Sequence, residues 1–151
     1  MKRPEQCPLC SHNKTHHFFH SCISNLVRDY FICCLCNLIF VPTQFHLSPK
    51  EQKDRYLQHN NDPNDPEYRK FLSKLSDELA PHLTHNSKGL DYGSGPGPTL
   101  AIMLEKDGFD MKTYDIFFQP DRSVLSQSYA FVTCTETAEH FSAPRKDFET
   151  L

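Results

Sequence analysis

The stretch LDYGSGPGPT, residues 90–99, places an acid at Asp91 and then a glycine at every second position of the loop that follows. Three of the chain's five glycines lie in this loop, namely Gly93, Gly95 and Gly97. Glycine costs conformational entropy, but it permits a left-handed backbone and lets another molecule approach the main chain. The stretch therefore predicts a loop that holds a ligand against its backbone.

Strand and helix patterns alternate on both sides of this loop. Lys88–Tyr92 is predicted to be a strand, Pro98–Lys106 a helix, and Met111–Asp115 and Tyr129–Glu136 two further strands. Strands that alternate with crossover connections predict an α/β fold with a parallel sheet. In such sheets ligands bind beyond the carboxyl ends of the strands, which is where the glycine loop falls.

A longer helix is predicted upstream of the loop. Asp65 can cap it, Pro66 suits its first position, and Pro81 ends it. Its buried face is predicted from apolar residues at a spacing of three to four, namely Tyr68, Phe71, Leu72, Leu75 and Leu79. A last helix is expected to begin near Pro144 and to run into the C-terminus.

Changes in composition divide the chain into three parts. Residues 1–42 are rich in Cys, His and Phe, residues 43–66 are polar with turns predicted at 59–66, and residues 67–151 carry the α/β pattern. We expect a zinc-binding module, a linker that covers a cofactor, and a ligand-binding domain, in that order. Tyr56 and the turn at 59–61 are the candidates for the cover, although a plain polar linker explains them equally well.

Two other nucleotide-binding loops fit the stretch poorly. A P-loop needs a Lys followed by Ser or Thr at the start of the helix, whereas this chain has Pro98 and Thr99 there. A dinucleotide-binding loop needs its last glycine at position 98, which is the same proline. A nicotinamide-dependent oxidoreductase is therefore a disfavoured alternative.

Residues 90–97 resemble the first motif of the class I S-adenosylmethionine-dependent methyltransferases, in which an apolar strand ends in an acid and G-x-G-x-G follows. The resemblance implies a Rossmann-like sheet, partial in this chain, with Asp115 at the end of the second strand as the acid that binds the ribose hydroxyls. Asp115 lies 24 positions after Asp91, close to the separation of about 20 typical of such contacts. The cofactor-binding residues so implied are Asp91, Gly93, Ser94, Gly95, Gly97, Asp115 and Thr135. Taken singly, each of the two acids is equally compatible with an ordinary turn residue at a strand end.

Residues 133–141, TCTETAEHF, resemble the fourth-strand motif of the same methyltransferases. The resemblance places Thr135 and Glu136 beside the transferred methyl group and the substrate. His140 is a candidate general base, because an imidazole titrates near neutrality. An equally good interpretation is that Glu139 and His140 hold the loop through hydrogen bonds. Methyl transfer needs little acid–base help when the nucleophile is aligned.

Two C-x-x-C pairs stand near the N-terminus, 22 residues apart. Four thiolates at about this spacing are typical of a structural zinc site, with Cys7, Cys10, Cys33 and Cys36 as ligands. Cys34 is predicted not to bind the metal, and Asn37 stands where such turns often have a left-handed glycine. Cys22 and Cys134 are predicted to be small buried residues.

Four histidines cluster between the cysteine pairs, namely His12, His16, His17 and His20. Four cysteines already complete a tetrahedral zinc shell. We therefore expect these histidines to be solvated or bonded to nearby groups.

The resemblance extends over nearly the whole chain, to one bacterial group of class I methyltransferase proteins with an N-terminal four-cysteine zinc segment. The segments that carry it are YFICCLCNLIFVP, HNNDPNDPEYRKFL, LDYGSGPGPTLA, YDIFFQPD and FVTCTETAEHF. The family's third-strand acid has no clear counterpart, with Asp121 as the nearest candidate. The family's later strands are also missing, so we expect either a partial chain or a partner, such as a second copy, that covers an exposed sheet edge.

Charge and hydropathy limit the remaining possibilities. Residues 1–55 sum to +3 and the rest to −6, within a net charge of −3. No dense basic stripe is present, so a zinc-finger protein that binds nucleic acid is disfavoured. No apolar run approaches the ~20 residues of a membrane span, and the N-terminus lacks a secretory signal, so a cytoplasmic location is expected.

These observations predict a methyltransferase that uses S-adenosylmethionine and a structural zinc ion, with an unidentified methyl acceptor. The alternative is a non-catalytic zinc-ribbon interaction protein with a degenerate Rossmann-like half-domain. The absent strands favour that alternative, whereas methyl transfer to any nucleophile would exclude it.

Overall fold

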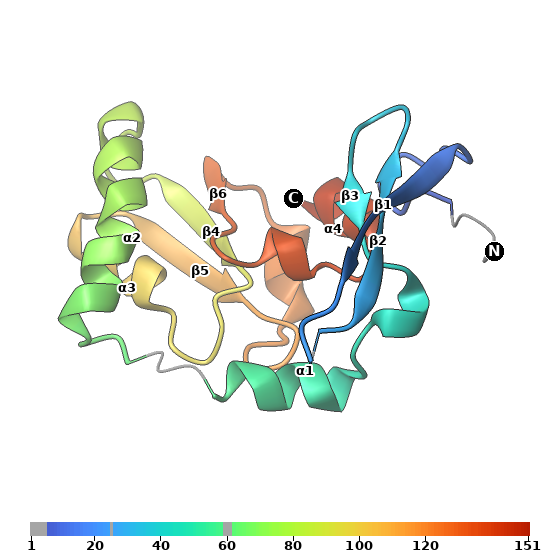
Figure 1. Cartoon of the computed structure of the whole chain (residues 1–151). Helices are drawn as coiled ribbons and strands as arrows, with labels where there is room; N and C mark the ends of the chain where they lie inside the picture. The colour runs from blue at the N-terminus through green and yellow to red at the C-terminus, as the bar shows by residue number, and fades with distance from the viewer. Residues whose placement is uncertain (1–5, 25, 59–61) are drawn as a thin grey trace. The chain divides into compact units, whose positions relative to one another are not determined.

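The computed structural model of the chain describes residues 6–24, 26–58 and 62–151 (Figure 1). The chain divides into two compact units, Met1–Ser48 with His140–Leu151, and Pro49–Glu139. Neither limit coincides with the predicted divisions at 42 and 66. Those domain boundaries stay a prediction, because compactness alone does not show which segments fold independently.

The first unit contains a small antiparallel sheet of order β1-β2-β3. Its strands are β1 (Thr15–Ser21), β2 (Arg28–Cys33) and β3 (Ile39–Phe40). The short helix η1 (Thr43–Phe45) follows the sheet, and the C-terminal helix α4 (Pro144–Thr150) belongs to the same unit. The guanidinium of Arg145 on α4 donates to Ser11 Oγ at 3.1 Å, so the C-terminal helix is bonded to the turn after the first cysteine pair.

The second unit contains a parallel sheet of order β5-β4-β6, which confirms the predicted α/β class. Its strands are β4 (Lys88–Tyr92), β5 (Asp110–Tyr114) and β6 (Phe131–Thr133). The prediction for the third strand was too long, because only three of its eight residues pair with β4. In the described part of the chain β5 and β6 are the edge strands. That a partner covers an edge stays a prediction.

Helices α2 (Pro66–Leu79) and α3 (Thr99–Lys106) pack on each other and on one face of this sheet (Figure 1). The core between them combines residues from helices and strands, namely Leu72, Leu100, Ala101, Leu104, Phe109 and Met111. Asp65 caps α2 as predicted, since its Oδ1 accepts from the backbone N–H groups of Glu67 and Tyr68 at 2.9 and 3.3 Å.

The predicted buried face of α2 is partly wrong. Leu72 is buried, but Phe71 and Leu75 are exposed, and Ser76 is buried in their place. The buried stripe is therefore narrower and rotated, running through Tyr68, Leu72, Ser76 and Leu79. The cluster that covers α2 does not include Phe71 or Leu75, which leaves these two apolar positions exposed.

Residues 43–66 are more regular than the predicted polar linker with turns at 59–66, of which residues 59–61 lie outside the described residues. Residues 43–66 contain η1 and the helix α1 (Pro49–Tyr56), which begins at a proline in the favoured first position. Helix α1 has no buried residue, so no apolar periodicity announced it. Helix α1 meets the turn after β5 through two ring contacts. The ring centroids of Tyr56 and Phe117 are 6.1 Å apart, and Lys53 Nζ lies 5.5 Å from the ring centroid of Phe118.

Short 3-10 helices complete the chain, namely η2 (Ala80–His82), η3 (Arg122–Ser126) and η4 (Ala138–His140). No helix among the described residues is long and apolar enough to cross a membrane. The cytoplasmic location stays a prediction.

Leu104→Ala is expected to lower the free energy of unfolding by about 2–5 kcal/mol. Leu104 belongs to α3 and is fully buried in the core that α3 shares with α2 and the sheet. Leu75→Ala is the matched control, since Leu75 is 37% exposed on α2. Urea unfolding followed by circular dichroism measures both variants. Equal losses would show that the core does not centre on α3.

Candidate functional site

The glycine loop leaves β4 with two left-handed residues, Gly93 at φ 78° and Gly95 at φ 67°. A Cβ on Gly93 would overlap the side chain of Thr137, so this glycine allows two loops to pack closely. A Cβ on Gly95 would meet nothing within 4 Å. The backbone of Gly95 therefore faces space that the described residues do not fill.

Backbone N–H groups fix this loop to the end of β5. Gly93 and Ser94 both donate to the carbonyl of Tyr114, at 2.7 and 3.2 Å. Gly95 N–H donates to Asp115 Oδ2 at 3.0 Å. The first glycine loop and the acid at the end of the second strand thus form one structural element.

Asp115 is held by the turn that follows it. Its Oδ1 accepts from the N–H groups of Phe117 and Phe118 at 2.8 and 3.0 Å, and the Asp115 and Gln119 backbones exchange two bonds of 3.0 Å. Each carboxylate oxygen has two lone pairs, so Asp115 Oδ2 keeps the capacity to accept from a further donor. The ribose-binding role of Asp115 stays a prediction.

Asp91 is a buried carboxyl group, only 5% exposed, at the carboxyl end of the central strand β4. It accepts a hydrogen bond from Thr133 Oγ1 on β6 at 2.8 Å. Burial raises the pKa of Asp91 to about 6, with a further contribution from the charge of Asp115, against the lowering effect of Thr133. No basic side chain among residues 6–24, 26–58 and 62–151 pairs with Asp91.

Two hydroxyl groups beside these acids are buried without a hydrogen-bond partner among the described residues. They are Ser94 Oγ, in the glycine loop, and Thr135 Oγ1, just after β6. Strands β4 and β6 are neighbours with Asp91 opposite Thr133, so both hydroxyls lie past the same carboxyl edge. Buried polar groups are nearly always bonded, so a pair of orphans at one edge indicates a place for a polar ligand.

Two tyrosines from the preceding helices border the acids. The pKa of Tyr68 on α2 is raised by burial and then by the charges of Asp91 and Glu136. The pKa of Tyr56 on α1 is raised by burial and then by Asp115 and Glu139. From the sequence, Tyr68 was predicted only to lie on the buried face of a helix. A buried tyrosine needs a polar partner for its hydroxyl, so a tyrosine within an apolar stripe is a signal of a polar site nearby.

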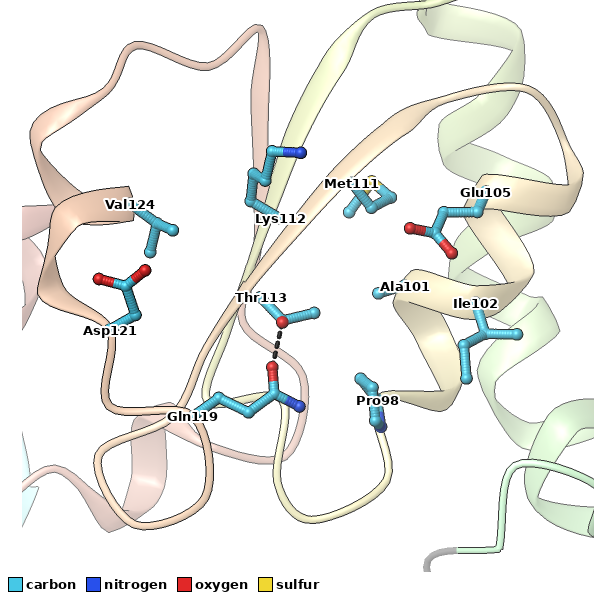
Figure 2. A pocket seen from close by; sticks show the side chains of 10 residues that line it. All are labelled: Pro98, Ala101, Ile102, Glu105, Met111, Lys112, Thr113, Gln119, Asp121 and Val124. Carbon is cyan, nitrogen blue, oxygen red and sulfur yellow. Dashed lines mark hydrogen bonds between the residues drawn. The ribbon is translucent and has the colours of Figure 1, made fainter.

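A cavity of about 390 Å³ lies on the side of β5 next to α3 (Figure 2). Figure 2 shows Glu105 of α3 and Asp121 on opposite sides of it, with Thr113 Oγ1 donating to Gln119 between them. Asp121 also caps η3 by accepting from Ser123 N–H at 2.8 Å. Of the residues named for the cofactor, only Asp121, the nearest counterpart of the third-strand acid, lines this cavity, so the edge formed by the glycine loop and the strand ends is the stronger candidate site.

A family model described as "methyltransferase domain" matches residues 58–151. The chain belongs to the methyltransferase-domain family. A search of curated proteins and a search of solved structures found no match. Membership in the family agrees with the parallel strands and the acid–glycine loop, which all lie within the matched residues.

The methyltransferase domain is preceded by a cluster of four cysteine thiols. The Sγ atoms of Cys7, Cys10, Cys33 and Cys36 all lie within 4.8 Å of one another, with Cys7–Cys36 and Cys10–Cys33 each at 3.6 Å. Tetrahedral ligands at the usual Zn–S length are about 3.8 Å apart. The cluster therefore has the dimensions of a four-thiolate metal site, as the C-x-x-C spacing predicts.

Both cysteine turns have the same backbone. Ser11 N–H donates to the Cys7 carbonyl at 3.0 Å and Asn37 N–H to the Cys33 carbonyl at 3.1 Å, and both Ser11 and Asn37 are left-handed, at φ 60° and 61°. The expected left-handed role of Asn37 is confirmed.

Backbone N–H groups, Cys36 first and Leu35 next, lower the pKa of the Cys33 thiol to about 7, whereas the pKa of Cys36, against its bond to the Leu38 backbone, is raised to about 12 by burial and the neighbouring thiols. Four thiols this close cannot all ionise without a cation, so the spacing of the Sγ atoms is the stronger sign of a metal site.

The remaining cysteines and histidines differ in part from expectation. Cys22 is exposed and Cys134 is half-buried, so the prediction that both are buried is wrong. Cys34 Sγ lies outside the four-thiol cluster and contacts His16 Nδ1 at 3.4 Å. His17 and His20 both contact Asp29, in agreement with locally bonded histidines.

The structure gives little support to the two predicted catalytic residues, Glu136 and His140. Glu136 is exposed and left-handed at φ 52°, an uncommon backbone for a residue other than glycine. His140 ends η4 and belongs to the first compact unit, whereas Glu136 belongs to the second. The roles of Glu136 and His140 stay predictions.

Asp91→Asn is expected to raise the free energy of unfolding by about 1–3 kcal/mol near pH 7. The folded pKa of Asp91, about 6, lies above the reference value of 3.8, so ionisation of this buried group destabilises the fold. Stability of the native chain should therefore fall as the pH rises from about 4 to 6 and then level off. The variant should lose this dependence.

Urea unfolding of the native chain and the variant at several pH values measures the effect, with the exposed Asp77→Asn as the control. If the free energy of unfolding of Asp91→Asn at pH 7 were lower than that of the native chain, the Asp91 carboxylate would have to be stabilised by a cation.

Proposed function

We propose that this chain is an S-adenosylmethionine-dependent methyltransferase. The methyltransferase-domain family match supports the reaction class. The choice of cofactor is supported by the chemistry at the carboxyl edge of the sheet. Its central support is the Gly95 N–H bond to Asp115 Oδ2, which joins the glycine loop to the second-strand acid.

The charges around the loop favour a cationic cofactor. Asp91 and Asp115 are close enough for one to raise the pKa of the other, and Glu136 and Glu139 act on the neighbouring tyrosines. S-adenosylmethionine carries a sulfonium and an ammonium group against one carboxylate, so its net charge complements these acids. The pyrophosphate of a nicotinamide cofactor would be repelled by them, and the loop lacks the lysine of a P-loop.

The described residues fit the functional groups of this cofactor. Asp115 Oδ2 is available to accept from ribose hydroxyls, and the buried hydroxyls of Ser94 and Thr135 lack partners that a polar amino-acid group would provide. The open space at Gly95 lets the ligand approach the backbone. The tyrosines at positions 56 and 68 would then limit access of water to the acids.

When bound, the cofactor supplies a methyl group on a sulfonium, which is a strong leaving group. The protein then contributes mainly by aligning the acceptor and excluding water, because a well-oriented nucleophile accounts for much of the rate. Glu136, at the end of the β6 connection, is proposed to face the acceptor, and His140 is proposed as a base for acceptors that must lose a proton.

We further propose that the four-cysteine cluster binds zinc with a structural role. Four thiolates leave no open coordination position, which is typical of structural sites and not of catalytic ones. Among the described residues of the first unit, Phe40 is the one large buried hydrocarbon side chain, and the other buried hydrophobic residues in its sheet and turns are Cys7 and Cys33. A metal would therefore supply stability that this small core does not.

Titration calorimetry of the zinc-loaded protein with S-adenosylhomocysteine is expected to show saturable binding, whereas NAD should show none. Asp115→Ala should weaken binding at least about tenfold, because a charge-assisted hydrogen bond is lost. Asp121→Ala should have a smaller effect, since Asp121 bonds to Ser123 in its own turn.

Circular dichroism and the zinc content of each variant serve as controls for folding. Equal losses in the two variants would contradict the ribose assignment of Asp115. Binding of NAD in place of S-adenosylhomocysteine by the folded protein would contradict the proposed cofactor.

A further inference from the structure

A second group of side chains with metal-ligating atoms lies on the β1–β2 hairpin, apart from the four cysteines. Unlike the four thiols, its three ligand atoms do not all lie within 4.8 Å of one another, so an ion would have to draw the two imidazoles together. Asp29 Oδ1 on β2 is 2.8 Å from His20 Nδ1 and 3.2 Å from His17 Nε2, both on β1. Two imidazoles and one carboxylate therefore meet at a single oxygen atom. Neither the proposed methyltransferase function nor the four-cysteine site uses any of the three.

A β-bulge brings these three side chains to one face. His17 and His20 are three positions apart, so in a regular strand they would point to opposite faces. The pairing of β1 with β2 shifts between His17 and Phe19, which leaves Phe18 as the extra residue. His20 then lies opposite Asp29, and His17 lies opposite Phe31, two positions along β2 from Asp29 on the same face.

The donor set suits a divalent transition metal. Imidazole nitrogens and a carboxylate oxygen are common ligands of zinc and its neighbours, and three protein ligands leave positions for water. The side chains of His17, His20 and Asp29 are 52%, 49% and 31% exposed, so water can reach a bound ion and His20 can turn toward it. His20 and then His17 lower the pKa of Asp29 through hydrogen bonds, which keeps its carboxylate ionised.

The ring of Phe31 restricts one of the ligands. It contacts His17 edge-on, with the ring centroids 5.8 Å apart and the planes at 83°. Such packing beside a metal-binding histidine limits its orientation, as outer contacts do in known metal sites. His16, on the same strand, is not part of the group and contacts Cys34 instead.

We propose that His17, His20 and Asp29 form a second metal site, which binds a zinc-like divalent ion on one face of the β1–β2 hairpin. The two imidazoles now contact the same Asp29 oxygen, and the ion takes the place of that shared contact. The site is independent of the four-cysteine cluster and of cofactor binding.

The test counts zinc per chain by native mass spectrometry and by calorimetry on the full chain, first with one equivalent of zinc in the four-cysteine cluster. The native protein is expected to take up a second equivalent. Asp29→Asn and His20→Gln are each expected to lose that second equivalent and keep the first. Cobalt substitution separates the sites, because only the four-cysteine site gives strong thiolate charge-transfer bands.

His16→Gln is the matched control, since it removes a histidine from the same strand without touching the group. It is expected to keep both equivalents. Uptake of only one zinc ion by the native protein would overturn the proposal. So would a second equivalent that survives in Asp29→Asn and His20→Gln, or one that is lost in His16→Gln, which would assign it to His16 and Cys34.

Discussion

A buried carboxylate without a cationic partner among the described residues is the constraint on which the second unit depends. Asp91 ends the central strand β4, and its burial keeps its pKa near 6. One hydrogen bond from Thr133 fixes its direction but does not neutralise its charge. A fold that keeps such a group gives up stability at neutral pH, which is a common property of binding and catalytic sites. A cationic ligand at this edge of the sheet would recover that free energy.

The second constraint is the connection between the strand ends. The loop after β4 donates backbone N–H groups to Tyr114 and Asp115 at the end of β5, and Thr137 after β6 donates to the carbonyl of Gly93 at 3.1 Å. The segments that follow the three neighbouring strands β4, β5 and β6 are therefore joined by hydrogen bonds. This arrangement fixes the acids and the orphaned hydroxyls before any ligand arrives, so little ordering would be needed on binding.

The sequence was most informative where local chemistry decides structure. The glycine loop, the Asp65 cap and the C-x-x-C turns follow from backbone conformation and short-range bonds, and the structure has all three. It was less informative where a surrounding element decides. Exposure of Phe71 and Leu75 depends on what covers α2, and α1 lacks an apolar stripe altogether. The bulge at Phe18 and the placement of Tyr68 beside two acids are consequences of strand pairing and packing, which no single segment encodes.

The most direct measurement is the pKa of Asp91 by carbon-13 NMR of its carboxyl group, with and without saturating S-adenosylmethionine. Without ligand, a value near 6 is expected. With the cofactor bound, the value should fall, because a nearby positive charge favours the ionised carboxylate. A pKa that is unchanged by S-adenosylmethionine would contradict the proposal that the acidic edge beside the glycine loop is a site for this cationic cofactor.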